Sequence, residues 1–204
     1  MQVYNTFGTT NLGLLLKKAV LKLVNIKAER YFVFEQDISH IVNTQILTDT
    51  FEVKEIKNTN IQNYDFSLFK NKYDRFVERL NNPSYKCYVV LKNNLCVYIT
   101  WISLKEFVMP RYVKNAVMLA DNEGFLFDSI CSNEYRGLGL HSFMNLYRLE
   151  RLWELGKSKA LVLVLEGNTP AIKVQERSGM FSKRVLKTFN CTWLGVKSVN
   201  ICEL

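Results

Sequence analysis

Two glycines in the second half of the chain, Gly137 and Gly139, stand between a stretch with strand character and a long helical stretch. Glycine tolerates backbone dihedrals that other residues avoid, so successive N–H groups of such a turn can converge on one point. The helix that follows adds free N–H groups and the partial positive charge of its N-terminus. Arg136 adds a charged donor at the rim. These residues predict an anion nest suited to a phosphate, although a plain glycine-rich turn has the same composition.

Two other phosphate-binding motifs do not fit the sequence. A Rossmann GxGxxG motif that begins at Gly137 would need a glycine where Ser142 stands. Residues 156–158 end like a P-loop, but Arg151 occupies the place of its first glycine, and the segment follows a helix rather than a strand. We therefore interpret Gly156 as the stop of the preceding helix.

The elements that position the turn are predicted by their apolar pattern. Residues 124–131 have strand character before the turn, and residues 140–155 have a helical pattern after it. Residues 160–165 form a continuous apolar run, as expected of a strand that is buried on both faces. Residues 169–177 are predicted to form a short helix, with Pro170 in its first turn.

The remaining elements complete a mixed order of strands and helices, which predicts an α/β or α+β sheet protein. A charged helix is expected at residues 65–80, and Lys92, Asn93 and Asn94 read as a hairpin turn. Further strands are expected at residues 30–34, 51–56, 87–91, 95–102, 113–119, 182–187 and 192–202.

Residues 11–25 carry the pattern of an amphipathic helix with a wide apolar side and a narrow polar face that includes Lys18 and Lys22. Such a helix hides its apolar side against its own domain, or it contacts a membrane surface or a partner. We expect residues 1–50, this helix and one strand, to form an N-terminal extension that packs on the domain.

Composition narrows the class of protein. The chain has 204 residues, which suits one domain, and hydrophobic residues make up 48% of it. The net charge of +8 fits a polyanionic partner such as nucleic acid, an acidic membrane or a phosphate-rich cofactor. The basic residues are spread along the chain rather than clustered, so we expect no nucleic-acid partner.

The cysteines and histidines argue against disulfides and metals. Five cysteines are an odd number, none forms a CxxC pair, and each lies in an apolar stretch, as expected of reduced thiols. His40 and His141 lie far apart without further ligands, so no metal site is expected. Lys17 and Lys18 interrupt the early apolar run that a signal peptide would need, and no run reaches the roughly 18 apolar residues of a membrane span. These features predict a cytoplasmic protein.

The turn and the segment after it resemble the GNAT superfamily of N-acetyltransferases. Arg136 and Gly139 match the first and fourth positions of its signature Arg/Gln-x-x-Gly-x-Gly/Ala. Asn168-Thr-Pro-Ala171 matches the Asn-x-x-Ala that follows the next strand of the family, and Gly179 ends the short helix as the family pattern does. The resemblance covers residues 51–204. It implies a mixed, mostly antiparallel central sheet flanked by helices, with residues 1–50 as an extension.

The resemblance also implies acetyl-CoA as cosubstrate, held in a V-shaped opening between the strands at residues 124–131 and 160–165. The pantetheine arm would lie near the end of the first of these strands, and the pyrophosphate at the glycine turn. The cofactor-binding residues that it implies are Ile130, Cys131, Arg136, Gly137, Leu138, Gly139, Leu140, His141, Asn168 and Ala171.

In this family the acceptor amine attacks the thioester directly, and a backbone N–H polarises the carbonyl group. A carboxylate or a water chain then takes the proton from the amine. Asp128 and Glu166 are the candidate catalytic residues because each lies beside one strand of the opening. Each also has an ordinary interpretation as a solvated charge, and an acyl-carrier role of Cys131 is a further alternative.

Two positions depart from the family pattern. His141 stands where the family has glycine or alanine, so the nest is narrower or holds the pyrophosphate differently, unless His141 is simply an exposed residue of the first helical turn. Gln175 stands where many members have a tyrosine that protonates the leaving thiolate. An amide is a poor acid, so that role is missing or is supplied elsewhere.

Four functions remain open from the sequence. The leading one is an N-acetyltransferase whose acceptor is a small-molecule amine, such as an amino sugar that is free or linked to a nucleotide. The second is acetylation of a protein N-terminus or lysine, for which an acidic peptide groove would be expected. The third is a non-catalytic CoA-binding module, and the last option is a DNA-binding module.

Overall fold

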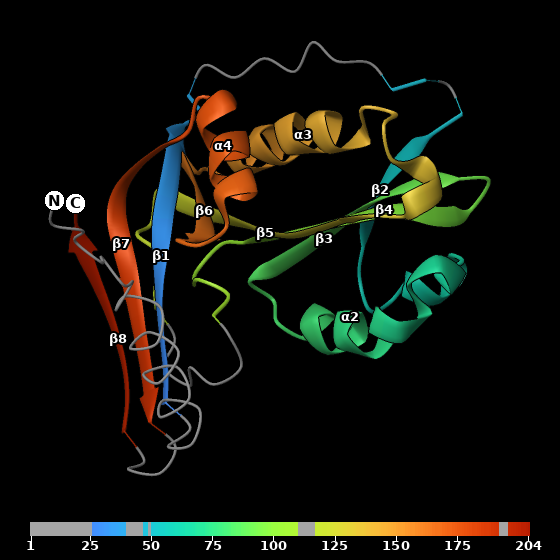
Figure 1. The fold of residues 1–204 in the computed structure, drawn as a ribbon. Coiled ribbons are helices and arrows are strands. Elements are labelled where there is room, and N and C mark those ends of the chain that lie inside the picture. Colours follow the sequence, from blue (N-terminus) through green and yellow to red (C-terminus); the bar gives the residue numbers. More distant parts are fainter. Residues whose placement is uncertain (1–25, 40–46, 49, 110–116, 192–195) are drawn as a thin grey trace, which may run out of the picture.

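A strongly twisted sheet of eight strands runs through the protein, in the order β2-β3-β4-β5-β6-β1-β7-β8 (Figure 1). The computed structural model describes residues 26–39, 47–48, 50–109, 117–191 and 196–204. The strands are β1 (Ile26–Asp37), β2 (Glu52–Ile56), β3 (Tyr85–Lys92), β4 (Leu95–Ser103), β5 (Glu123–Cys131), β6 (Lys159–Leu165), β7 (Phe181–Cys191) and β8 (Val196–Glu203). The helices are α2 (Tyr73–Leu80), α3 (Leu140–Glu154) and α4 (Thr169–Arg177), with short 3-10 turns η1 (Ile61–Asn63), η2 (Ser67–Lys72) and η3 (Asn133–Tyr135).

The sheet is mostly antiparallel, as the sequence predicts. Six neighbouring strand pairs are antiparallel, and only β5 and β6 run parallel. Two strands joined by a helix on one face are expected to be parallel, because the connection returns the chain to the same end of the sheet. Here α3 is that connection. The predicted fold class is therefore confirmed.

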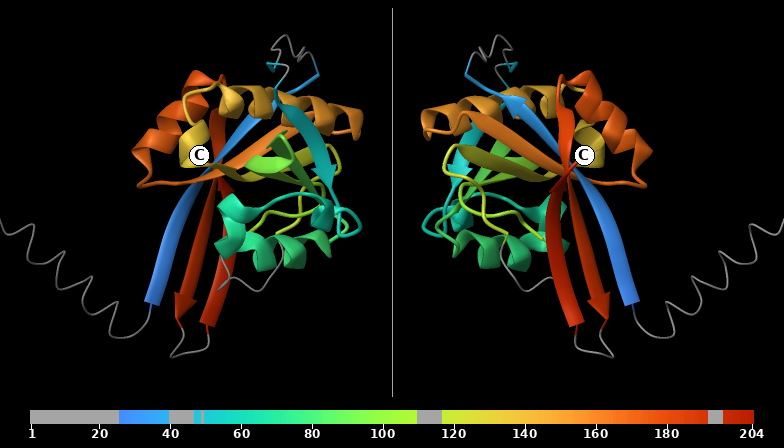
Figure 2. Two further views of the ribbon diagram at one scale, coloured as in Figure 1. Left: turned by 90° about the vertical axis from the view of Figure 1, so that its right-hand side faces the viewer. Right: turned by 90° about the vertical axis from the view of Figure 1, so that its left-hand side faces the viewer.

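Helices cover the two faces of the sheet unequally: α3 and α4 lie on one face, and α2 with η2 lies on the other (Figures 1 and 2). Side chains of β4 point alternately to the two faces of the sheet, so this strand contributes to the core under the helices on both faces. Tyr98 packs with Met144 and Leu152 under α3, whereas Trp101 packs with Phe76 of α2. All five side chains are at most 1% exposed, so both layers have a dry core.

β1 is an interior strand, because it hydrogen-bonds to β6 on one side and to β7 on the other. Residues 31–37 pair with β6, and residues 26–35 pair with β7. The strand expected at residues 30–34 is thus longer and is part of the main sheet. The division of the chain at residue 50 stays a prediction, and the helix expected at residues 11–25 lies outside the described residues.

Two expected elements differ in the structure. The helix expected at residues 65–80 starts later, because Asp65 is tied to the β3–β4 hairpin: its N–H donates to Asn94 O, and its carbonyl accepts from Cys96 N. Residues 67–72 form a 3-10 turn before α2 instead. Of the strand expected at residues 113–119, residues 113–116 lie outside the described part, and Met118 makes only an isolated bridge to Glu106.

None of the helices in the described ranges has the length and apolar character needed to cross a membrane.

Candidate functional site

β5 and β6 pair over only three residues and then separate. The parallel pairs are Glu123 with Lys159, Gly124 with Ala160 and Phe125 with Leu161. At this paired end α3 packs so closely on Gly124 that a Cβ atom there would come within 2.3 Å of the Leu152 side chain. Beyond Phe125 and Leu161 no pairing joins the two strands, so their facing edges keep backbone groups for a ligand.

A β-bulge interrupts β5 where the two strands separate. Ile130 pairs with Ile99 and Phe127 with Trp101 of β4, so Asp128 and Ser129 together oppose Thr100. Asp128 has a φ of 49°, in the left-handed region. The bulge turns the Asp128 side chain toward α2, where it meets Arg79, while the Ser129 hydroxyl lies 2.8 Å from the Thr100 hydroxyl.

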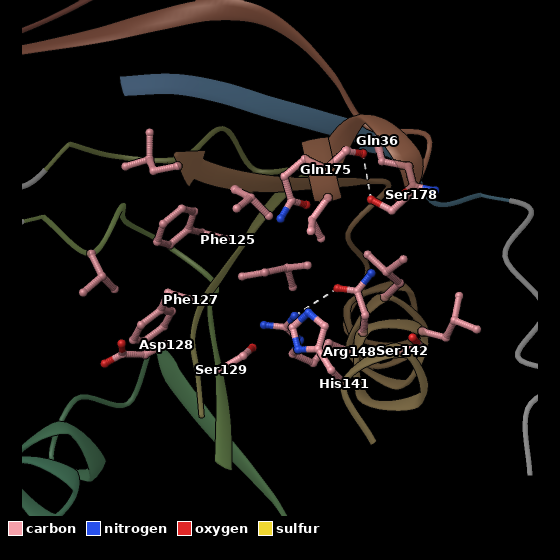
Figure 3. A pocket seen from close by; sticks show the side chains of 18 of the residues that line it. Gln36, Phe125, Phe127, Asp128, Ser129, His141, Ser142, Arg148, Gln175 and Ser178 are labelled. Carbon is pink, nitrogen blue, oxygen red and sulfur yellow. Dashed lines mark hydrogen bonds between the residues drawn. The ribbon is translucent and has the colours of Figure 1, made fainter. Parts of the chain in front are cut away.

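A cavity of about 770 Å³ occupies the separation of β5 and β6. Its lining comes from both faces of the sheet: α3 and α4 on one side, and Arg75 and Arg79 of α2 on the other. Figure 3 shows His141 and Arg148 entering from α3, Gln175 from α4, and Ser129 from β5 opposite them. A ligand could therefore reach from one face of the sheet to the other.

The glycine turn lies beside this cavity. Gly137 and Gly139 have φ values of 79° and 75°, and Gly139 is the N-cap residue of α3. A Cβ atom at either position would meet nothing within 4 Å, so glycine is favoured by backbone conformation rather than by space. A second hollow of about 450 Å³ is lined by Leu138 and Gly139 and shares Ser142 with the large cavity. The two hollows are therefore neighbours, one at the turn and one at the bulge.

His141 is exposed in the first turn of α3, as one interpretation of the sequence expected, and a hydrogen bond joins its ring to the core. Its Nδ1 atom lies 2.8 Å from the hydroxyl of Tyr98, which is fully buried. Burial lowers the pKa of His141 from its ordinary value, and the positive charge of Arg148 lowers it further. Burial raises the pKa of Tyr98. Both side chains are therefore neutral near pH 7, and His141 presents a neutral imidazole to the cavity.

The similarity of the chain to known proteins is structural. No protein-family model and no curated protein matches its sequence. A GCN5-related N-acetyltransferase from Kribbella flavida matches 85% of this chain and 62% of its own, with 11% identity and a TM-score of 0.53. A tandem GNAT protein from the clavulanic acid biosynthesis pathway matches 99% of this chain and 62% of its own, with 11% identity and a TM-score of 0.52.

A third structure, a GCN5-related glucosamine N-acetyltransferase region of a fungal multi-domain enzyme, matches 92% of this chain and 24% of its own, at 13% identity and a TM-score of 0.54. The chain has the GNAT fold. It spans about three fifths of the length of the first two of these structures. The opening between two parallel strands that the GNAT resemblance implies is present between β5 and β6.

Within the GNAT fold, the two candidate catalytic carboxylates lie apart. Asp128 lines the cavity, but Arg79 Nη1 donates to its Oδ2 atom at 2.5 Å, and Arg75 Nη2 lies 3.6 Å from the same oxygen. Glu166 follows β6 on the side of β1, where it forms an ion pair with Arg30, and it does not line the cavity. Of the two carboxylates, Asp128 lies at the opening, and two arginines, Arg79 and Arg75, lie against it.

The residues expected to bind the cofactor divide into three groups. Those of the turn, Arg136 to Gly139, are exposed, and Leu140 is buried as the first anchor of α3. Ile130 and Cys131 are half-buried at the end of β5, and burial raises the pKa of the Cys131 thiol. Asn168 caps α4, because its side chain accepts a hydrogen bond from Ala171 N at 3.3 Å.

Sequence reasoning did not point to Arg75, Arg79 or Arg148, which line the cavity. Arg79 contacts Asp128 from 49 residues away, so no local pattern points to it. For Arg148 the sequence does contain a signal. Met144, Arg148 and Leu152 recur at intervals of four, which places an arginine in the apolar stripe of α3. Arg148 is 4% exposed.

Proposed function

We propose that the protein is an N-acyltransferase that transfers an acetyl group from acetyl-CoA to a primary amine. The observation that supports this most is the separation of β5 and β6 after three paired residues, with a cavity in the gap that is lined by residues from both faces of the sheet. The residues present fit a long ligand with phosphates at one end, because one hollow lies at the turn before α3 and a neighbouring one at the bulge in β5.

In this proposal the chain binds and orients the reactants. The turn from Arg136 to His141 would hold the pyrophosphate, and the free edges of β5 and β6 would hold the pantetheine arm. Acetyl-CoA supplies an activated thioester. A backbone N–H of β5 near the bulge would polarise its carbonyl group, since an oriented donor in a water-poor site stabilises developing negative charge. No residue of the chain has to act as a nucleophile.

The amine must reach the carbonyl in its neutral form and lose a proton during transfer. Asp128 is the carboxylate at the cavity, but a proton on it would leave Arg79 and Arg75 without their counterion. We therefore propose that Asp128 positions the bulge and that water in the opening carries the proton outward. His141, neutral near pH 7, is a second possible acceptor of that proton.

The acceptor that we propose is a small-molecule amine, such as a free or nucleotide-linked amino sugar. The net charge of +8 suits an acceptor with an anionic carrier. Arg75 and Arg79 line the α2 side of the cavity, opposite the face of α3 and α4. One structure with the same fold is named a glucosamine N-acetyltransferase region, which is a reason to test glucosamine.

A non-catalytic CoA-binding module is the second candidate. It is favoured by two observations: Asp128 and Glu166 both lie in ion pairs with arginines, and Gln175 lines the cavity at the position where many family members carry an acidic tyrosine. The two candidates share the CoA site and differ only in turnover.

Two measurements test the proposal. Calorimetric titration with CoA should give saturable binding, and acetyl-CoA should raise the melting temperature, because a ligand that binds only the folded state stabilises it.

Release of free CoA thiol should then depend on an acceptor from a panel of amino sugars, nucleotide-linked amino sugars, polyamines, amino acids and peptides. Binding without release favours the non-catalytic module. Peptides that exceed every small amine tenfold in kcat/KM would contradict the acceptor class, and absence of CoA binding would contradict both candidates.

A further inference from the structure

Arg148 is a buried cation that lines the cavity and has no anion beside it in the described ranges of the chain. Its residue is 4% exposed, and its side chain enters the gap from α3 opposite Ser129 of β5 (Figure 3). Arg148 Nη2 donates to Asn145 Oδ1 at 2.9 Å, while its Nε has no hydrogen-bond partner. Among the residues that the structure describes, no carboxylate lies within ion-pair distance of it.

The other arginines that lie deep in the fold are paired. Arg79 is 8% exposed and holds Asp128, and Arg184 bridges the buried Glu35 and Glu123. In the described part of the chain, carboxylates thus pair with the deep guanidinium groups of Arg79 and Arg184 but not with that of Arg148. Burial lowers the pKa of Arg148, yet an arginine side chain stays protonated in proteins.

A buried charge without a counterion is unfavourable, because the groups that surround it do not replace its hydration. The groups near Arg148 are neutral. Burial raises the pKa of the Tyr98 hydroxyl and lowers the pKa of the His141 imidazole, so both stay uncharged near pH 7. A ligand that carries an anion would supply the missing counterion. Arg148 lines the cavity, so a ligand there could approach its guanidinium group, while the unpartnered Nε is itself enclosed.

Arg148 lies apart from the turn that is expected to hold the phosphates of CoA. Arg148 follows Gly139 by nine residues, which places it about 13 Å along α3 from the turn at a rise of about 1.5 Å per residue. At that depth it lies near the bulge in β5, where the reacting groups would meet. A planar guanidinium matches a carboxylate with two parallel hydrogen bonds.

We propose that Arg148 binds a carboxylate group of a substrate where β5 and β6 separate. The proposal rests on the proposed acyl transfer. The carboxylate belongs to the acyl group, as in a succinyl thioester, or to the acceptor, as in an amino acid. In both cases the amine nitrogen bonds to the thioester carbonyl carbon and the C–S bond breaks. Water in the opening takes the proton lost by the amine, and the departing CoA thiolate is protonated to the thiol. The carboxylate itself stays unchanged.

The first arm of the test compares succinyl-CoA with butyryl-CoA, which has nearly the same length and no charge on the acyl chain. The second arm keeps acetyl-CoA and compares a mixture of α-amino acids with the same amino acids as carboxamides. Binding is measured by calorimetry and turnover by thiol release. We expect the carboxylate to be preferred by about 10- to 100-fold in one arm, since hydrogen bonds to charged groups have that strength.

Three variants show whether Arg148 causes the preference. Arg148→Met removes the charge and should abolish the preference while CoA binding persists, and Arg148→Lys should retain part of it. Arg151→Met, on the same helix but in ion pairs with Glu150 and Glu154, is the matched control and should keep the preference. The melting temperature of Arg148→Met without ligand should be unchanged or higher, because a buried unpaired charge is replaced by an apolar side chain.

The outcomes separate this inference from the proposed function. Equal affinity for charged and neutral ligands in both arms, with normal CoA binding, would overturn the role of Arg148 and leave acyl transfer standing. A preference that survives in Arg148→Met would also overturn it. A protein that binds no CoA at all would overturn the proposed function and this inference together.

Discussion

Arg79 of α2 and Asp128 of β5 form an ion pair in the wall of the cavity, with Arg79 Nη1 2.5 Å from Asp128 Oδ2. The guanidinium also lies over the rings of Trp101 and Phe127, with 5.5 and 5.2 Å to their centroids. Because Asp128 has a positive φ, the pair joins α2 to the one residue of β5 with a left-handed backbone. The helix thereby fixes the bulge.

The variant Asp128→Asn separates a positioning role from a catalytic one. Asparagine keeps the shape and tolerates the left-handed backbone, but it removes the charge that Arg79 faces. We expect the free energy of unfolding to fall by about 1–3 kcal/mol and kcat to stay within about tenfold. Chemical denaturation and thiol release measure the two effects.

Arg75→Gln is the control for this variant, since Arg75 is half exposed and 3.6 Å from Asp128; we expect its stability to change by less than about 0.5 kcal/mol. A loss of kcat of about 10²- to 10⁴-fold in Asp128→Asn at unchanged stability would instead make Asp128 the general base.

The glycine turn is tested by a pair of substitutions of equal size. Gly139 has a φ of 75° and free space around its Cα, so Gly139→Asn should fold and keep weakened CoA binding. Gly139→Asp places a negative charge beside the phosphates and should abolish binding. Arg136→Ala should weaken binding by about 1–3 kcal/mol, as expected for one hydrogen bond to a charged group. Calorimetry with CoA measures all three, and equal binding by the Asn and Asp variants would place the pyrophosphate elsewhere.

The pH dependence of stability should contain a contribution from His141. Its pKa in the folded protein lies below the ordinary 6.5, so the unfolded state binds its proton more readily. This contribution to the free energy of unfolding is complete above pH 6.5 and is lost as the pH falls toward the folded pKa. His141→Gln should reduce the slope of stability against pH below about pH 6.5, the ordinary pKa of the imidazole. An unchanged slope in urea unfolding of the variant would contradict the assignment.

The closed end of the opening depends on the absence of a side chain at Gly124. A Cβ atom there would lie 2.3 Å from one methyl group of Leu152 and 2.8 Å from the other, and Leu152 is fully buried. Gly124→Ala should therefore cost about 1–3 kcal/mol of stability through overpacking. The double variant with Leu152→Ala should lose less than the sum of the two single variants.

Gly167→Ala is the control for Gly124→Ala, because a Cβ atom at Gly167 meets nothing within 4 Å. Additive losses in the double variant, measured by denaturation, would contradict the close contact between Gly124 and Leu152.

Local chemistry made part of this structure predictable. Glycines between a strand and a helix predicted the turn at Gly137 and Gly139, which have the left-handed backbone that favours glycine. Asn93 and Asn94 predicted the hairpin, and both have positive φ values. Pro170 and Asn168 predicted the start of α4. In each case the residues that specify the element are those that form it.

Contacts between distant segments could not be predicted in the same way. The sequence gives no sign that residues 26–37 pair with both β6 and β7, because strand composition does not encode the partner. The same holds for Asp128: its carboxylate appears free in the sequence, and the arginines that bind it come from α2. Arg148 illustrates a third reason why the site could not be predicted. Its place in an apolar stripe of α3 indicates that it is buried, but the sequence does not show whether a described carboxylate lies beside it.

The position of β1 also determines when the opening can form during folding. All partners of β1 lie more than 120 residues further along the chain, the nearest pair being Asp37 with Lys159. Contacts of such separation carry a large loop-closure entropy and form slowly. β6 shares only three residue pairs with β5 but seven with β1, so its alignment depends mainly on β1. The β2–β5 half of the sheet can form first from near neighbours, and the second wall of the opening is completed only after residues 159–191 have been synthesised.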